Sequence, residues 1–159
     1  MKVTFKNVGQ GDSIILEWET DGINKIGIID CNKVNRKNPV LDYIASLEID
    51  SIEFIIITHP HDDHYSGFRS LLQFVEDKKI EIKWFGHTLA NVGRKYWIHF
   101  EQGNESLKDL DFIIRKGLHL KNIGLLKRWE IISGNSQIEI DKNIFLQSLS
   151  PSHDEIEKY

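Results

Sequence analysis

The stretch FIIITHPHDDH, residues 54–64, joins a run of apolar residues to a segment rich in histidine and aspartate. Residues 54–57 are all apolar, which is typical of a strand buried on both faces of a sheet. In an extended segment, residues two apart point the same way, so His59 and His61 can bind one metal ion. Asp63 and His64 come after the chain turns and can bind a second ion. Imidazole and carboxylate ligands suit zinc, manganese or iron, so this stretch predicts a metal site directly after a buried strand.

The segments on either side of this stretch carry both strand and helix patterns. Alternating or continuous apolar residues, with an Asp21-Gly22 hairpin turn between the second and third runs, predict strands over 3–5, 14–16, 26–29, 54–57 and 80–85, with further strands in 129–149 separated by turns at 134–135 and 141–143. Apolar residues at helical spacing predict helices over 39–47, 68–75 and 107–118. Residues 88–102 have no clean period and are expected to form a loop. The fold class is therefore α/β or α+β, with strands outnumbering helices.

Composition limits the classes of protein that the chain can belong to. At 159 residues with 40% apolar residues, residues 1–159 are expected to form one globular domain. Eight Phe and four Trp argue against disorder, and no apolar run approaches the ~20 residues of a membrane span. A single cysteine, Cys31, permits no internal disulfide, and the chain starts without a signal-peptide pattern, so we expect a soluble cytoplasmic protein. A net charge of −4, with both signs mixed along the chain, excludes a nucleic-acid-coating surface but leaves room for a local anionic substrate.

The motif resembles the signature of a known family. His59, His61, Asp63 and His64 stand as HxHxDH after a hydrophobic strand, as in the metallo-β-lactamase-fold hydrolases. Residues 8–15 and 28–31 look like the opening of the branch that includes the metallo-hydrolase domain of the DNA-uptake competence protein. The resemblance implies an αββα sandwich. The alternative interpretation of the motif is a polar loop capped by histidines, or a relic in a domain that binds no metal.

Two residues after the third predicted strand extend the resemblance. Asp30 matches the acidic residue of the family that supports a ligand histidine from behind. The family has glycine two positions later, where this chain has Asn32. Because asparagine tolerates a left-handed backbone better than most residues, we expect the turn to survive.

The resemblance implies a site with two zinc ions, with manganese or iron as alternatives. His59 and His61 would hold the first ion together with a later histidine, and His153, which follows the strand-like 144–149, stands in the matching place. Asp63 and His64 would hold the second ion. Ser152 and Glu155 give the segment around His153 a second explanation, a capping box at a helix start without any metal. Both explanations stay open from the sequence.

The remaining cysteine and histidines are expected to lie outside the chemistry. Cys31 is expected to be a small buried thiol, although it stands next to Asp30. His87 is expected on the surface, and His99 and His119 are expected to be structural or solvated.

Family members that hydrolyse substrates carry later strands, an aspartate that bridges the metals and a final histidine, and none of these follows His153 in this sequence. We therefore expect the N-terminal part of the fold, with an apolar face left uncovered. The missing part would come from a longer protein, from a second chain or from a homodimer; a degenerate domain is the other alternative. Alone, the chain is expected to dimerise or aggregate.

The sequence thus predicts a metal-dependent hydrolase domain that uses a metal-bound hydroxide. Asp63 could orient the water, and Asp30 would fix a histidine tautomer. The competence-type resemblance favours a phosphodiester substrate, either nucleic acid or nucleotide. The alternative is a non-catalytic, metal-binding sensing or docking module at the N-terminus of a larger assembly, and no membrane partner is expected.

Overall fold

A six-stranded mixed sheet runs through the centre of the structure. The computed structural model describes residues 1–88, 105–132, 134 and 137–149. In spatial order, which is also chain order, the strands of the sheet are β1 (Lys2–Phe5), β2 (Ile14–Thr20), β3 (Ile23–Ile29), β4 (Ser51–Ile57), β5 (Glu81–His87) and β6 (Leu126–Ile131). The first three strands pair antiparallel, and β3 to β6 pair parallel.

The turn between β2 and β3 has the conformation that its sequence predicts. Asp21 and Gly22 both have positive φ angles, 54° and 78°, and they connect the paired residues Thr20 and Ile23. Two left-handed residues in a row form the hairpin turn whose twist matches that of the flanking strands. The Asp21-Gly22 turn is therefore confirmed.

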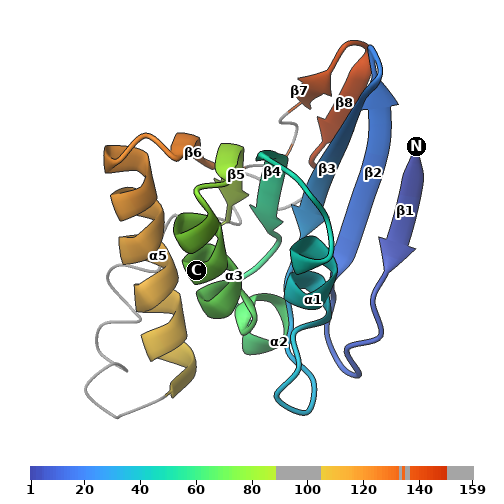
Figure 1. The fold of residues 1–159 in the computed structure, drawn as a ribbon. Helices are drawn as coiled ribbons and strands as arrows, with labels where there is room; N and C mark the ends of the chain where they lie inside the picture. Colours follow the sequence, from blue (N-terminus) through green and yellow to red (C-terminus); the bar gives the residue numbers. More distant parts are fainter. Residues whose placement is uncertain (89–104, 133, 135–136, 150–159) are drawn as a thin grey trace.

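Helices cover one face of the sheet (Figure 1). They lie in the crossover connections that the parallel strands require. The helices of the described residues are α1 (Pro39–Ala45), α2 (Asp62–Tyr65), α3 (Phe68–Lys78) and α5 (Glu105–Asn122). α1 begins at the Asn38 cap, whose side chain accepts a hydrogen bond from the Leu41 N–H at 3.1 Å, with Pro39 in the first turn. α3 packs between α1 and α5.

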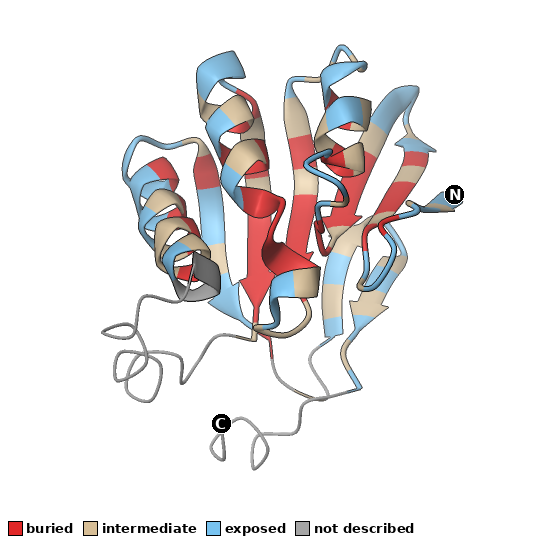
Figure 2. Cartoon of the chain, turned by 90° about the horizontal axis from the view of Figure 1, so that it is seen from below, coloured by how far each residue is buried: buried red, intermediate tan, exposed pale blue. Residues whose placement is uncertain are grey.

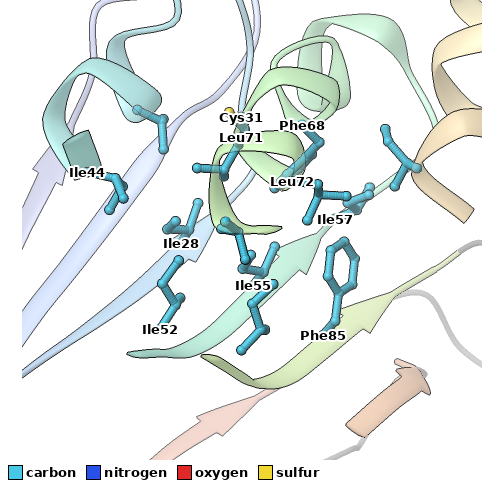
Figure 3. Packing of buried hydrophobic residues seen from close by; sticks show 14 of the residues in the cluster. Ile28, Cys31, Ile44, Ile52, Ile55, Ile57, Phe68, Leu71, Leu72 and Phe85 are labelled. Atoms are coloured by element: carbon cyan, nitrogen blue, oxygen red, sulfur yellow. The ribbon is translucent and has the colours of Figure 1, made fainter. Parts of the chain in front are cut away.

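The main core lies between these helices and the sheet (Figure 3). Ile28, Ile55 and Phe85 from three neighbouring strands pack in one cluster with Ile44 from α1 and Leu72 from α3, and all five are fully buried. Buried residues run along the central strands (Figure 2). This layer holds the ends of β3 and β4 in fixed positions.

A second, smaller cluster lies on the opposite face of the sheet. Trp18, Phe54 and Trp84 form its aromatic centre. A two-stranded antiparallel sheet, β7 (Gln137–Asp141) and β8 (Ile144–Gln147), packs aliphatic side chains against it. β4 therefore contributes to both clusters, and the predicted burial of residues 54–57 on both faces is confirmed.

The small sheet leaves one edge of this second face open. Val3 and Phe5 on β1 pair with Leu16 and Ile14, and are 50% and 74% exposed. Val3 and Phe5 thus leave apolar surface exposed on β1, beside the area that β7 and β8 cover. Other exposed apolar side chains of the described residues lie on β3, α5, β6 and β8. Among the described residues, no helix combines the length and hydropathy that crossing a bilayer requires.

The structure adds detail to the predicted elements and differs from them at several points. The strands and the helices over 39–47, 68–75 and 107–118 are present, but the first helix ends at Ala45, two residues early. The region predicted to hold strands from 129 begins its first strand at Leu126. α2 was not predicted, because four residues are too few to carry a helical period. The expected helix after Ser152 lies outside the described residues.

Candidate metal centre

Two parallel strands bring the candidate residues to one edge of the sheet. Asp30 follows β3 and Thr58 follows β4, and Ile29 pairs with Ile56 in the register of these strands. The Asp30 N–H donates to the Ile56 carbonyl at 2.9 Å, which extends the pairing by one residue. The carboxyl ends of parallel strands are where ligands bind in open α/β sheets. The HxHxDH segment therefore starts at an edge suited to a binding site.

Asp30 holds the start of this segment with both carboxylate oxygens. Oδ1 accepts from the Thr58 N–H at 2.9 Å, and Oδ2 accepts from the Thr58 hydroxyl at 2.6 Å. His64 Nδ1 lies 2.8 Å from Oδ2. The Asp30 side chain is 2% exposed, and its backbone is left-handed with φ 56°. Burial raises the pKa of this carboxyl, and the hydrogen bonds from Thr58 and His64 oppose the rise.

The carboxylate of Asp30 determines what the His64 ring can do. A carboxylate acceptor assigns the ring proton to Nδ1, which leaves the Nε2 lone pair for a metal ion or a proton. His64 is buried on α2, and its backbone N–H donates to the His61 carbonyl at 2.9 Å. Nε2 lies 3.8 Å from Asp63 Oδ1. Asp63 and the Nε2 atom of His64 are thus placed next to each other.

The rings of the other two motif histidines lie beside His64. The ring centroids of His59 and His64 are 3.7 Å apart, and those of His59 and His61 are 4.7 Å apart. Burial, followed by the neighbouring His64 and His61 rings, lowers the pKa of His59. This shift favours the neutral imidazole, which is the form that binds metal. The motif brings three imidazole rings together at the end of β4.

Asp12 also approaches this centre, although no sequence pattern singled it out. Its carboxylate lies 3.9 Å from His64 Nδ1, and donor atoms of Asp12, Asp30 and His64 lie within 4.8 Å of one another. Among the described residues, these are the three potential ligands whose donor atoms come this close together. The group includes His64 but not His59, His61 or Asp63. Because Nδ1 already bonds Asp30, we interpret this group as support for the ring rather than as the metal ligands.

A close backbone contact places Asp12 there. The Asp12 N–H donates to the Asp63 carbonyl at 3.3 Å. A Cβ atom on Gly11, whose φ is 97°, would lie 2.1 Å from the same carbonyl oxygen, so only glycine fits. In the sequence, Gly9 and Gly11 just before Asp12 are consistent with such a close approach, but they do not identify Asp63 as the partner.

The turn after β3 differs from the expectation for Asn32. Among the described residues the left-handed position of this turn is Asp30, and Asn32 is not left-handed. Asn32 instead donates to the Gln10 carbonyl at 2.7 Å and accepts from the Ser66 hydroxyl at 2.6 Å. Its side chain ties the first connection to the end of α2, a role that its amide group supports and glycine could not.

The other cysteine and histidines differ in their burial. Cys31 is fully buried, as expected, and burial raises the pKa of its thiol. His119 is exposed and its Nε2 lies 2.7 Å from Glu76, also as expected. The expectation of a surface His87 was wrong, because its ring lies buried at the end of β5 with its centroid 4.6 Å from that of Trp129. His99 and His153 lie outside the described residues.

Comparison with protein-family models and with curated proteins finds no match to this chain. The residues of the site are therefore the basis for assigning its chemistry. Imidazole rings with a carboxylate beside them are the ligand types that a borderline divalent ion such as zinc takes. His64, with its tautomer set by Asp30, is the best prepared of these donors.

Proposed function

We propose that this chain is a metal-dependent hydrolase domain of the metallo-β-lactamase type. The observation that carries the proposal is the gathering of His59, His61 and His64 at the end of β4, with His64 held by Asp30. The mixed sheet, with helices on one face and a small second sheet on the other, supports an αββα sandwich.

In this proposal the motif residues divide between two ions. His59 and His61 hold the first ion, with His153 as its further ligand, and Asp63 and His64 hold the second. A bound zinc ion, or manganese or iron in its place, would supply a water molecule acidic enough to ionise near neutral pH. Asp63, beside Nε2 of His64, would orient that water, and Asp30 would keep the His64 ring in its tautomer.

The proposed substrate is a phosphodiester, in a nucleic acid or a nucleotide. This part rests on the resemblance of residues 8–15 and 28–31 to the competence-type branch. A downstream segment, a second chain or a second copy would complete the small sheet, and the exposed Val3 and Phe5 beside it support that part of the proposal.

Metal content tests the proposal most directly. We expect about one or two equivalents of metal per chain in the wild type, measured by plasma mass spectrometry after dialysis against zinc. His61 is exposed, so His61→Ala should leave the fold intact while metal affinity falls by at least about tenfold. His119→Ala is the matched control, since His119 is also exposed and lies on α5. Equal metal content in both variants would contradict the proposal.

Activity then separates catalysis from a structural metal. The metal-loaded wild type should hydrolyse a phosphodiester such as bis(p-nitrophenyl) phosphate, and His61→Ala should not. The sensing or docking module is the second candidate, and the link from the Cys31 N–H to the His64 carbonyl at 2.8 Å favours it, because it ties the motif into the fold. That module would lose thermal stability on metal removal and show no turnover.

A further inference from the structure

A cavity on the helical side of the molecule has a charge opposite to that of the whole chain. It has a volume of about 590 Å³, is partly open to solvent, and is lined by residues of the segment 33–37, α1, α3 and α5. Four of its ten lining residues are Lys or Arg and one is acidic, against 20 Lys and Arg among 159 residues and a net charge of −4 overall. The cations are Lys33, Arg36, Lys37 and Arg69.

Two of these cations, Lys33 and Arg69, lie beside a carboxylate, and the other two differ from them in this respect. Asp109 accepts from Arg69 Nη1 at 2.7 Å, and Lys33 Nζ lies 4.0 Å from the same carboxylate. Among the described residues, neither Arg36 nor Lys37 takes part in an ion pair, and both side chains are exposed. An anion that enters the cavity therefore meets two positive charges that no residue in the described part of the chain pairs with.

Arg36 occupies a backbone conformation that its side chain does not favour. Asn35 and Arg36 have φ angles of 50° and 64°, in a turn closed by two hydrogen bonds between Val34 and Lys37, at 2.9 and 3.0 Å. Asparagine adopts the left-handed region more readily than arginine does. An arginine held in such a turn suggests a use for its guanidinium group.

The walls of the cavity are preformed. The Lys33 N–H donates to the Ser66 hydroxyl at 3.0 Å, which fixes the start of the basic loop. Buried Asn38 donates to the Gly67 carbonyl at 2.8 Å and to the Ser70 hydroxyl at 2.9 Å, so the loop, α1 and α3 are joined. Leu41 and Phe112 add apolar surface to the same cavity. Small-molecule sites combine these features, with apolar walls and a few placed polar groups.

We propose that this cavity binds a phosphate ester of nucleotide size. Arg36 and Lys37 would contact the phosphate, because both present charge-assisted donors without an ion-pair partner among the described residues. Leu41 and Phe112 would contact the rest of the molecule. Asp42, which also lines the cavity, weakens binding of an anion. The proposal does not depend on the hydrolase function, since its residues are separate from the metal motif.

The test is a titration of the ¹⁵N-labelled full chain, followed by NMR, with a chelator present to remove any metal. The probes are inorganic phosphate, AMP and a short oligothymidylate. AMP should bind more tightly than phosphate and shift the amide signals of Lys37, Ser70 and Phe112. Absence of a saturable shift, or equal binding of phosphate and AMP, would overturn the proposal. Tighter binding of the oligothymidylate, with a steep salt dependence, would support the site and identify a nucleic-acid strand as the source of the ester.

Matched variants locate the charge that matters. Lys37→Gln should weaken AMP binding by at least about fivefold, because a charge-assisted contact is lost. Lys78→Gln removes the same charge from an exposed lysine at the end of α3 and should have no effect. Arg36→Asn should weaken binding without loss of thermal stability, and Asp42→Asn should strengthen it. Equal weakening by Lys37→Gln and Lys78→Gln would show general surface attraction and overturn the site.

Discussion

Asp30 and Asp141 are two aspartates that join neighbouring parts of the fold, but their surroundings differ. Asp30 bonds Thr58 and the His64 ring at the end of β3. Asp141, on β7, accepts from the Trp18 indole at 2.7 Å and from the Thr20 hydroxyl, and pairs with Lys25 at 3.0 Å. Burial raises the pKa of Asp30, whereas the hydrogen bonds from Thr20 and Trp18 hold the pKa of Asp141 well below its usual range.

The difference indicates two uses of a carboxylate. At Asp141 a lysine and several donors stabilise the charged form, so the residue fastens the small sheet to β2 and β3. At Asp30 the charge is buried against a histidine, an arrangement that favours orienting a ring over adding stability. Substitutions at the two aspartates and at Thr58 should separate these uses, with effects that fall from Asp30 through Asp141 to Thr58.

Asp30→Ala should lower the free energy of unfolding by about 3 kcal/mol, because it leaves the Thr58 N–H and the buried His64 ring without their acceptor. Urea unfolding followed by circular dichroism measures this. Asp30→Asn keeps an oxygen for the Thr58 N–H and should cost less. A loss below about 1 kcal/mol for Asp30→Ala would contradict the account of Asp30 as the acceptor that the Thr58 N–H and the His64 ring need.

Asp141→Asn should loosen the small sheet while the large sheet stays intact. Amide exchange should rise in β7 and β8 and stay unchanged in β3 and β4, because the new carboxamide lacks the negative charge that Lys25 and Thr20 bind. The amide exchange rates of β4 serve as the internal control.

The pH dependence of stability gives a second test of the role of Asp141. The pKa of Asp141 is lowered by folding, so its stabilising effect is complete above the ordinary aspartate pKa of about 4 and is lost as the pH falls from there toward the lower folded pKa. The stability difference between wild type and Asp141→Asn should therefore be constant from pH 7 to about pH 5 and shrink below about pH 4. A difference that grows as the pH falls would contradict the account of Asp141.

Thr58→Val should have the smallest effect, a loss of about 1 kcal/mol, because it removes one hydroxyl donor from Asp30 and keeps the shape. Thr58→Ser retains the hydroxyl and should stay within about 0.5 kcal/mol of wild type. If the two variants are equally stable in thermal unfolding, the Thr58 hydroxyl does not support Asp30.

Local patterns predicted the parts of the fold that local physics controls. The apolar run at 54–57 indicated a strand buried on both faces, and Asp21-Gly22 indicated its turn. His87 and Asp12 could not be placed in this way. His87 is buried because Trp129, on the next strand of the sheet, covers its ring, and Asp12 reaches the site through a contact with Asp63. Such placements depend on tertiary packing that no local period reveals.

The candidate site was likewise predicted only in part from the sequence. The spacing of the HxHxDH motif predicted that His59 and His61 bind one ion and His64 a second ion nearby. The three rings lie together, and the division between two ions stays a prediction. The basic cavity was not predicted, although three cations stand within residues 33–37, because Arg69 joins them only through the packing of α3. The metal ligands themselves remain a prediction.

The position of the single cysteine gives this protein a built-in reporter. The Cys31 N–H donates to the His64 carbonyl, the Cys31 carbonyl accepts from the Gly67 N–H at 2.7 Å, and a Cβ on Gly67 would lie 2.6 Å from the cysteine sulfur. Cys31 is fully buried, so a thiol reagent can reach Sγ only when the structure around it opens, for example when the segment from His64 to Gly67 moves away from Cys31. The rate of thiol labelling would therefore report how often Cys31 becomes accessible, and no cysteine or tag would have to be added to the chain.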